Sequence, residues 1–354
     1  MAWESPPERV LCIKLKHIGD VLLATAAIRA LRRAWPSCQI AALVPEGTEE
    51  VLQGNPDLTA IFTHDRGAGL AGAWRTIRAI RRYAPSLVLE MGGGDREAIL
   101  GWLSGARLRV GYAPGMSGGW RRILLTQSVS WNGNQHIVET NLDLIRACGL
   151  TAVAGQPVLA VRSEAAGRMS ARLQAAGLGV GQPLIVVHPV SRWLFKAWPE
   201  VSCAGVLASL AHRREYAVAV TSGPEAREVS AVTRIVQRAA VPVINLAGQT
   251  SLADLAAILQ RAVLFLGVDS APMHMAAALG VPVVVLFGPS GEHSWGPWGA
   301  GHTVLTSPFL CRPCGQDGCL GSKRSDCLEA ISAQAVLEAV DALLARGVLA
   351  AGRG

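Results

Sequence analysis

Long apolar runs are missing from this chain of 354 residues. Its longest apolar stretches, such as residues 281–287, contain about seven residues, whereas a membrane-spanning helix needs about 20. The initial segment MAWESPPERV also lacks the apolar centre of a secretory signal. We therefore expect a cytoplasmic protein.

Tyrosine and phenylalanine are scarce, with three and five residues respectively. No aromatic residues are spaced as a platform for stacked bases, which argues against nucleic acid as the main partner. The formal net charge is nevertheless +7, and arginines concentrate in residues 29–33, 75–82 and 107–122. Nucleic acid, a nucleotide or a phosphorylated membrane surface would each match this charge. A small phosphorylated ligand agrees best with the shortage of aromatic residues.

Charged residues make up only 17% of the chain and hydrophobic residues 50%, which excludes a disordered protein. At roughly 150 residues per domain, the length favours two domains. Short apolar runs alternate with segments of helical spacing, a pattern typical of parallel sheets covered by helices. The sequence therefore predicts an α/β fold with two doubly wound domains.

The expected elements form two series, separated by a Gly- and Ala-rich linker around residues 151–161. Strands are expected at 10–15, 39–44 and 86–91, then at 184–188, 217–221, 243–246, 263–267 and 281–287. Helices are expected at 21–35, 70–83 and 136–148, then at 200–212, 225–238, 252–260, 273–279 and 333–344. Ligands of open parallel sheets bind at the carboxyl ends of strands, so the loops after strands should carry the chemistry.

The loop KHIGD follows the first expected strand and opens a helix. It lacks the G-x-G-x-x-G spacing of a dinucleotide site, which disfavours a dehydrogenase. Its one carboxylate, Asp20, would lie at a helix N-terminus, where backbone N–H groups and positive partial charge gather. Asp20 is therefore either an N-cap or a general base that faces a hydroxyl in a cleft between the domains.

Two loops of the second series carry polar residues beside an expected helix start. The loop HPVSRWLFKAWPE places Ser191, Arg192 and Lys196 where phosphate oxygens bind well, although it could also be a solvated basic loop. The segment TSGPE follows the next strand, so Glu225 or Glu228 could accept hydrogen bonds from ribose hydroxyls. Surface helices are rich in glutamate, which makes this second signal weak by itself.

The segment GVDSAPMH is the most informative loop. Gly267, Ser270 and Ala271 are small enough to let backbone amides approach a diphosphate, and Pro272 suits the first turn of a helix. His274 is either a ligand contact or a packed histidine. The chain has no D-x-D pair. Basic side chains and helix N-termini, rather than a carboxylate-held Mg²⁺, would therefore meet the charge of a diphosphate leaving group.

Four of the eight cysteines form the pattern C-x2-C-x4-C-x7-C in a polar loop, namely Cys311, Cys314, Cys319 and Cys327. In a reducing cytosol, four thiolates suit Zn²⁺ or an iron–sulfur cluster better than disulfides. The spacing matches no standard ribbon or ferredoxin pattern, so free thiols are the alternative. The other four cysteines lie in apolar patterns typical of a core.

Several segments together resemble the ADP-heptose:lipopolysaccharide heptosyltransferases of glycosyltransferase family 9. They are IKLKHIGDVLLATAAIRALRRAWP, HIVETNLDLI, FKAWPE, TSGPE, NLAGQTSLADLAAIL and GVDSAPMHMAAALGVPVVVLFGPS followed by WGPW. The details are most similar to the heptosyltransferase III type. The resemblance implies a GT-B fold, with two Rossmann-like doubly wound domains facing a central cleft. It also implies inverting transfer of heptose from ADP-heptose without a required metal or cofactor.

The resemblance assigns a role to individual residues. It implies that Asp20 is the catalytic base and that Lys196 binds the phosphates of the donor. The full set of expected donor-binding residues is Ser191, Lys196, Glu225, Glu228, Asp269, Ser270, Ala271, Met273 and His274.

The resemblance also implies a division of labour between domains. Residues 1–160 would bind the acceptor, 161–330 would bind the nucleotide sugar, and 331–354 would form a C-terminal helix and tail. Alternatives are a different nucleotide sugar or acceptor, a GT-B-fold epimerase or hydrolase, and a non-catalytic anion-binding scaffold.

A basic helix in the first domain carries Arg78, Arg81 and Arg82. We expect it to bind the phosphorylated core of a lipid-linked lipopolysaccharide acceptor. The enzyme would then make peripheral contact with the inner face of the inner membrane.

Overall fold

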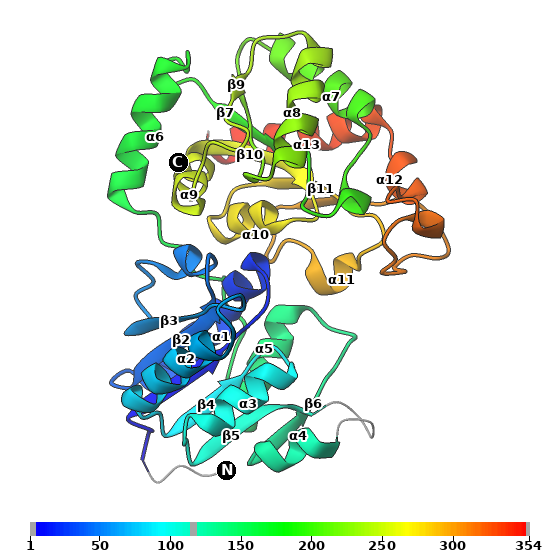
Figure 1. Ribbon diagram of the computed structural model, residues 1–354. Helices are drawn as coiled ribbons and strands as arrows, with labels where there is room; N and C mark the ends of the chain where they lie inside the picture. The colour runs from blue at the N-terminus through cyan, green and yellow to red at the C-terminus, as the bar shows by residue number, and fades with distance from the viewer. Residues whose placement is uncertain (1–4, 114–118, 352–354) are drawn as a thin grey trace. The chain divides into compact units, whose positions relative to one another are not determined.

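The alternating apolar and amphipathic segments form two parallel β-sheets of six strands each (Figure 1). The computed structural model describes residues 5–113 and 119–351. Contacts within the chain divide it into two units, Met1–Ala160 and Val161–Gly354. Residues 151–162 contain no helix or strand. The predicted α/β fold class, with two doubly wound sheets, is confirmed.

The first unit has the strand order β3-β2-β1-β4-β5-β6. Its strands are β1 (Arg9–Ile13), β2 (Gln39–Pro45), β3 (Ala60–His64), β4 (Leu87–Glu90), β5 (Leu108–Ala113) and β6 (Gln127–Ser130). Its helices are α1 (Ile18–Ala34), the short η1 (Glu49–Leu52), α2 (Gly69–Tyr83), α3 (Asp95–Leu103), α4 (Gly119–Leu124) and α5 (Ile137–Ala147). This strand order is that of a Rossmann sheet.

The second unit repeats this order as β12-β11-β10-β7-β8-β9. Its strands are β7 (Leu184–His188), β8 (Ala217–Val220), β9 (Ile244–Asn245), β10 (Ala262–Val268), β11 (Val283–Leu286) and β12 (Thr303–Leu305). Its longer helices are α6 (Ser163–Ala175), α7 (Glu200–His212), α8 (Ala226–Ala239), α9 (Leu252–Arg261), α10 (Ala271–Ala278) and α13 (Ala333–Ala351). Its short helices are η3 (Leu194–Lys196), α11 (Glu292–Trp295), η4 (Cys319–Gly321) and α12 (Asp326–Glu329).

The central strands are almost entirely apolar because helices cover both faces of each sheet. On one face of the first sheet, Leu11 and Ile13 pack with Ile80 of α2 and Leu100 of α3. Side chains alternate between the faces of a strand, so Cys12 points to the other face, where α1 and α5 pack against each other.

Helix α13 belongs to the core of the second unit. Val336, Val340 and Leu343 are buried in one apolar cluster with Leu264 of β10 and Leu286 of β11. Within the segment expected as a C-terminal helix and tail, residues 331–354, helix α13 therefore packs on the second sheet through residues as far as Leu343. Residues 352–354 of the expected tail lie outside the described residues.

The sequence patterns missed several elements. Strand β3 is short and only half-buried, and β5 contains an arginine, so neither shows a clear apolar run. No strand or helix was expected between residues 114 and 135, but α4 and β6 lie there, while residues 114–118 are outside the described part of the chain. None of the helices described in 5–113 and 119–351 is long and apolar enough to span a membrane.

A carboxyl group is buried in the first sheet. Glu90, at the end of β4, is fully buried, and neither of its carboxylate oxygens has a hydrogen-bond partner among the described residues. Gly101 and Gly111 make room for it, since a Cβ at either position would come within 2.9 Å of its oxygens. Burial raises the pKa of Glu90 to about 8, against the opposing charge of Arg121. The folded protein therefore keeps this proton at neutral pH.

Glu90→Gln should change the pH dependence of stability. The unfolded chain releases the Glu90 proton near its ordinary pKa of 4.5, whereas the folded chain holds it to about 8. Between these values the folded state binds more protons, so stability falls as pH rises, by at most about 1.4 kcal/mol per pH unit. Glu90→Gln should match the parent at pH 5 and melt at a higher temperature at pH 8. Glu46→Gln, at an exposed carboxylate, is the control, and parallel pH profiles for the parent and Glu90→Gln would contradict a buried neutral carboxyl.

Candidate active site

Each sheet has one point at which its strand order reverses, between β1 and β4 in the first unit and between β7 and β10 in the second. In open parallel sheets, ligands bind beside such a point, at the carboxyl ends of the strands. The segments that directly follow these four strands contain Asp20, the glycines 92–94, Lys196 and Asp269. The topology thus brings together, within each unit, segments far apart in the sequence.

Asp20 lies in the first turn of α1. The N-cap of this helix is His17, and Asp20 is the third helical residue, whose Oδ2 accepts a hydrogen bond from the backbone N–H of His17 at 3.3 Å. The expected alternative of an N-cap role is therefore corrected to a capping-box role. The side chain is half-exposed, and no hydrogen bond to its Oδ1 is found among the described residues.

Lys14, at the end of β1, is buried beside this helix start. Its Nζ donates hydrogen bonds to the carbonyl oxygen of Met91 at 2.8 Å and to Oδ1 of Asn141 at 3.2 Å. Burial lowers the pKa of Lys14, and the negative charges of Asp20 and Glu97 oppose that shift. The sequence analysis did not single out Lys14, because a lysine at the end of an apolar run does not by itself indicate a buried side chain.

Glu97 ties the loops after β1 and β4 together. Its carboxylate accepts hydrogen bonds from the N–H of Leu15 at 2.6 Å and from the N–H of Gly94 at 2.7 Å. A Cβ on Gly92 would lie 1.8 Å from this carboxylate, so only glycine fits there. Gly92 and Gly94 therefore let a buried carboxylate approach the backbone.

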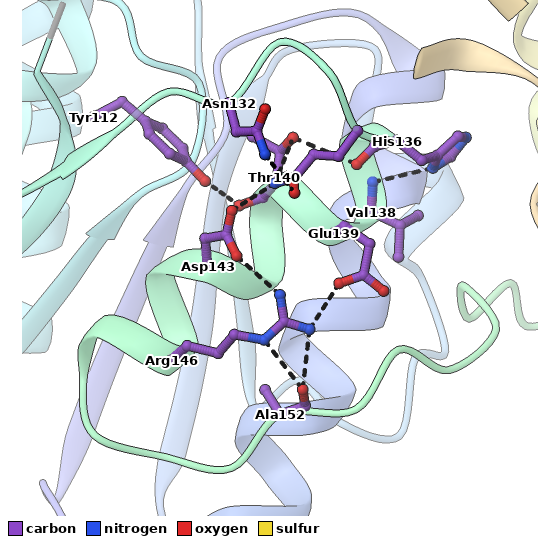
Figure 2. A network of polar contacts seen from close by, with 10 residues as sticks. Tyr112, Asn132, His136, Val138, Glu139, Thr140, Asp143, Arg146 and Ala152 are labelled. Atoms are coloured by element: carbon purple, nitrogen blue, oxygen red, sulfur yellow. Dashed lines mark hydrogen bonds and ion pairs between the residues drawn. The ribbon is translucent and has the colours of Figure 1, made fainter. Parts of the chain in front are cut away.

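Helix α5 is fixed by a network of polar contacts (Figure 2). Arg146 donates hydrogen bonds to Glu139 at 2.7 Å, to Asp143 at 2.8 Å and to the carbonyl oxygen of Ala152 at 3.1 Å. Because it joins two carboxylates of the helix to the chain that follows, Arg146 holds α5 in place. Asn141, the partner of Lys14, lies on this helix.

In the second unit, Lys196 and Asp269 form an ion pair. The distance from Nζ to Oδ2 is 2.5 Å, and the two side chains are only 16% and 8% exposed. Ser290 donates a second hydrogen bond to the same Oδ2 at 2.5 Å, and Lys196 lies 5.0 Å from the ring centre of Trp193. Lys196 and Asp269 were predicted as donor-binding residues and are adjacent in space, whereas Ser290 was not predicted.

Helix α10 begins directly after β10. Ser270 is its N-cap, and its hydroxyl donates to the carbonyl oxygen of Val268 at 3.1 Å. Pro272 lies in the first turn, as expected, and Met273 and His274 are buried. The N-terminus of α10, with its positive partial charge, thus starts beside Asp269 at the carboxyl end of the sheet.

The two candidate ribose ligands have different surroundings. Glu225 is exposed and forms ion pairs with Arg192 at 3.6 Å and Arg227 at 3.0 Å. Glu228 is buried and accepts a hydrogen bond from the N–H of Gly223 at 3.2 Å, and burial raises its pKa. The carboxylate of Glu228 is therefore held against the turn after β8, while that of Glu225 is not.

His188 is a further polar residue that sequence reasoning did not single out. Its Nδ1 lies 2.9 Å from the hydroxyl of Thr221, at the ends of the neighbouring strands β7 and β8. Burial lowers the pKa of His188 to about 4, so the imidazole is neutral at physiological pH. The pair ties together the loops that carry Ser191 and the two candidate ribose ligands. Ser191 itself is buried and accepts a hydrogen bond from the N–H of Trp193 at 3.3 Å.

The arginines expected to bind the acceptor are exposed on α2, and two of them lie far from Asp20. Arg81 donates to the carbonyl oxygen of Leu103, and the neighbouring Tyr83 bonds to the carbonyl oxygen of Gln39, where β2 begins. Arg81 and Arg82 thus lie at the amino edge of the sheet, whereas Asp20 follows the carboxyl end of β1. The structure does not bring these arginines and Asp20 together.

The loop with four cysteines packs on the donor-site loops of the same unit. The N–H groups of Cys314 and Gly315 both donate to the carbonyl oxygen of Pro289, and Ser325 donates to the carbonyl oxygen of Phe195. In residues 5–113 and 119–351, no three His, Cys, Asp or Glu side chains are arranged to hold a metal ion. The described arrangement therefore does not fit a four-thiolate site, and the metal at these cysteines stays a prediction.

Two doubly wound units, each with polar loops at its switch point, agree with the expected GT-B fold. The model of glycosyltransferase family 9 (heptosyltransferase) matches residues 73–324. The lipopolysaccharide heptosyltransferase 3 of Escherichia coli is 32% identical to this chain over 292 residues, which cover 80% of this chain and 84% of the relative. The chain therefore belongs to glycosyltransferase family 9.

Solved structures show the same fold. A glycosyl transferase family 9 structure from Veillonella parvula has a TM-score of 0.84 at 23% identity, and the match covers 96% of this chain and 97% of that one. The E. coli heptosyltransferase WaaC with ADP has a TM-score of 0.74 at 19% identity, with 95% and 99% covered.

Metal analysis of protein purified without oxygen tests the cysteine loop. The spacing of the four thiols predicts about one equivalent of zinc or iron per chain, and Cys314→Ser should lose it. Among the described residues no three such ligands are gathered, so metal binding would require the loop to rearrange. Zinc or iron well below one equivalent in the parent would leave free thiols or disulfides instead.

Proposed function

We propose that this chain transfers a heptose from ADP-heptose to the inner core of lipopolysaccharide, with inversion at the anomeric carbon. The observation that carries the proposal is the pair of switch-point sites. One holds a half-exposed carboxylate, Asp20, and the other holds Lys196 and Asp269 beside the N-terminus of α10. Membership of family 9, the named function of the E. coli relative and the ADP bound to WaaC support this choice of substrates.

Asp20 would act as the general base. Its Oδ2 is occupied by the N–H of His17, and this bond fixes the direction of the side chain. Its Oδ1 would take the proton from an acceptor hydroxyl as that oxygen attacks the anomeric carbon from the face opposite the leaving group. The buried Lys14 lies within electrostatic reach of Asp20, whose negative charge opposes the lowering of the lysine pKa by burial.

Lys196 and the first turn of α10 would stabilise the departing ADP. Negative charge grows on the diphosphate as the bond to the sugar breaks, and a fixed ammonium group and backbone N–H groups offset it. The partial burial of Lys196 strengthens that interaction because less water screens it. These groups act without a bound metal or cofactor, so no step of the proposed reaction uses the cysteine loop.

Asp269 would keep Lys196 in place between turnovers. The short ion pair fixes Nζ beside the start of α10, and Ser290 satisfies a further lone pair of the same carboxylate. Sugar hydroxyls of the bound donor would also donate hydrogen bonds to this carboxylate. Asp269 would therefore orient both the ammonium group and the transferred sugar.

Glu228 is the better candidate for the ribose. A carboxylate that accepts from two ribose hydroxyls must be held in one position before the donor arrives, and the N–H of Gly223 holds Glu228. Glu225 is exposed to solvent and already forms ion pairs with two arginines, so hydrogen bonds from the ribose would stabilise its carboxylate less.

Asp20→Asn should abolish transfer and preserve the fold. The amide oxygen still accepts the N–H of His17, so α1 keeps its cap, but the amide does not take up the proton of the acceptor. We expect a loss of about 10²-fold to 10⁴-fold in kcat, with ADP affinity nearly unchanged. Transfer assays and calorimetric ADP titration measure the two quantities.

Asp254→Asn is the matched control for this substitution. Asp254 occupies the same third position of a capping box, at the start of α9, and bonds to the N–H of Ser251. It should cost stability, because Arg168 loses its charged partner, and leave turnover of the folded protein unchanged. A fully active Asp20→Asn enzyme would remove the proposed base, and release of heptose without an acceptor would indicate a hydrolase.

Glu228→Gln and Glu225→Gln separate the two ribose candidates. We expect Glu228→Gln to raise the KM for the donor about tenfold, since a charge-assisted hydrogen bond is lost, and Glu225→Gln to change it less than about twofold. Steady-state kinetics at saturating acceptor measure both values. The opposite ranking would assign the ribose to Glu225.

A further inference from the structure

Large apolar side chains are exposed on one helical face of the first unit. We name this surface, formed by α2, α3 and α4, the three-helix face. Its exposed apolar residues are Leu70 and Trp74 on α2, Ile99 and Trp102 on α3, and Trp120 and Ile123 on α4. Tryptophan is rarely left in water, and Trp74 is 67% exposed. Six large apolar side chains exposed on neighbouring helices are more than the isolated exposed residues of an ordinary surface, and they point to an interaction site.

The three helices lie next to one another. Helix α3 packs against both α2 and α4 (Figure 1). Arg81 of α2 donates to the carbonyl oxygen of Leu103 at the end of α3. Arg121 of α4 donates to the carbonyl oxygen of Gly93, just before α3, and pairs with Asp95 at 3.5 Å. The exposed residues of the three helices therefore belong to one surface.

Each helix presents its apolar pair on the side opposite to its buried residues. On α2, Gly72, Thr76 and Ile80 face the sheet, while Leu70 and Trp74 are four residues apart and exposed. The pairs on α3 and α4 are three residues apart, which likewise places them on one side of a helix. None of these side chains contributes to the buried core.

The three-helix face is strongly basic. The three helices contain seven arginines and two carboxylates, and Glu97 is buried, which leaves Asp95 as their exposed acid. Within the described residues, the exposed arginines 75, 78, 82, 96 and 122 form no ion pair. Two copies of such a face would repel each other, so a second copy of this chain is a poor occupant.

We propose that the three-helix face docks on an anionic phospholipid bilayer. The tryptophans would lie at the level of the headgroups, Leu70, Ile99 and Ile123 would enter the acyl boundary, and the unpaired arginines would contact lipid phosphates. Such a surface combines an apolar and an electrostatic contribution, and stable peripheral binding usually needs two. A protein partner would have to match both a dispersed positive charge and six separate apolar side chains.

The lipid, rather than the sugar acceptor, is the ligand of this surface. Arg81 and Arg82 lie at the amino edge of the sheet, away from Asp20, so a glycan held by Asp20 does not explain their exposure. The proposal deepens the proposed function, because a membrane-bound transferase would meet a lipid-linked acceptor more often. Binding to lipid itself requires neither donor nor acceptor.

Flotation of the full chain with vesicles free of lipopolysaccharide tests the proposal. We expect binding to phosphatidylcholine vesicles that contain about 30% phosphatidylglycerol and little binding to phosphatidylcholine alone. The bound fraction should fall between about 50 mM and about 500 mM salt. The triple variant Trp74→Ala/Trp102→Ala/Trp120→Ala should bind about tenfold more weakly at low salt, because the interfacial anchors are lost.

Two controls distinguish binding through the three-helix face from nonspecific binding to vesicles. Trp131→Ala removes a tryptophan of the same unit that is 47% exposed but lies on none of the three helices, and it should bind like the parent. Arg75→Gln/Arg78→Gln/Arg82→Gln should lose binding, whereas Arg214→Gln/Arg238→Gln/Arg346→Gln, with the same change in charge on exposed residues of the other unit, should keep most of it. Melting temperatures verify that each variant is folded.

Three outcomes would overturn the proposal. They are equal binding of the tryptophan variant and the parent, equal losses from the two arginine triples, and binding only when vesicles contain the lipopolysaccharide acceptor. The last result would assign the arginines to sugar phosphates instead. Because the assay contains no sugar donor, an inactive transferase that still binds vesicles would refute the proposed function and leave the docking surface intact.

Discussion

The reversal of strand order at the centre of each sheet is the constraint on which the rest of the structure depends. It opens a place at the carboxyl ends of two neighbouring strands and leaves two loops there that must be fixed relative to each other. Each unit fixes them with a buried carboxylate. Glu97 accepts hydrogen bonds from the N–H groups of Leu15 and Gly94. Asp269 accepts hydrogen bonds from the ammonium group of Lys196 and the hydroxyl of Ser290.

Such carboxylates are costly to bury, and that cost explains the geometry around them. A carboxylate out of water needs most of its lone pairs satisfied, since an unpaired buried charge costs several kcal/mol, of order 3–5. Glu97 and Asp269 meet this need with close donors, whereas Glu90 has none and keeps its proton instead. The same logic makes Lys196 a suitable phosphate ligand. A diphosphate can replace or share its bond with Asp269 without leaving an uncompensated ammonium group.

Much of the fold could be predicted from the sequence because its signals are local. An apolar run followed by a polar loop and a helical period shows where a strand ends, so Asp20, Lys196 and Ser270 could all be placed at strand ends. Lys14 and Ser290 could not, since their partners are 127 and 21 residues away and depend on which strands are neighbours. The arrangement of the four cysteines was equally beyond the sequence. Their spacing predicts a metal, but backbone contacts with Pro289 determine where the loop lies.

The basic helix shows how a local signal can predict exposed residues without showing which edge of the sheet they lie beside. The sequence of α2 predicts an exposed face with arginines, and the structure has one, but a helix that returns antiparallel to the strands carries its C-terminal arginines away from the carboxyl edge. The tryptophans that surround them come from three separate segments, and no periodicity within one helix relates them. The first unit can therefore hold its reaction site at the carboxyl edge of the sheet and bind a large anionic surface elsewhere, on the three-helix face. The two sites do not compete for the same residues.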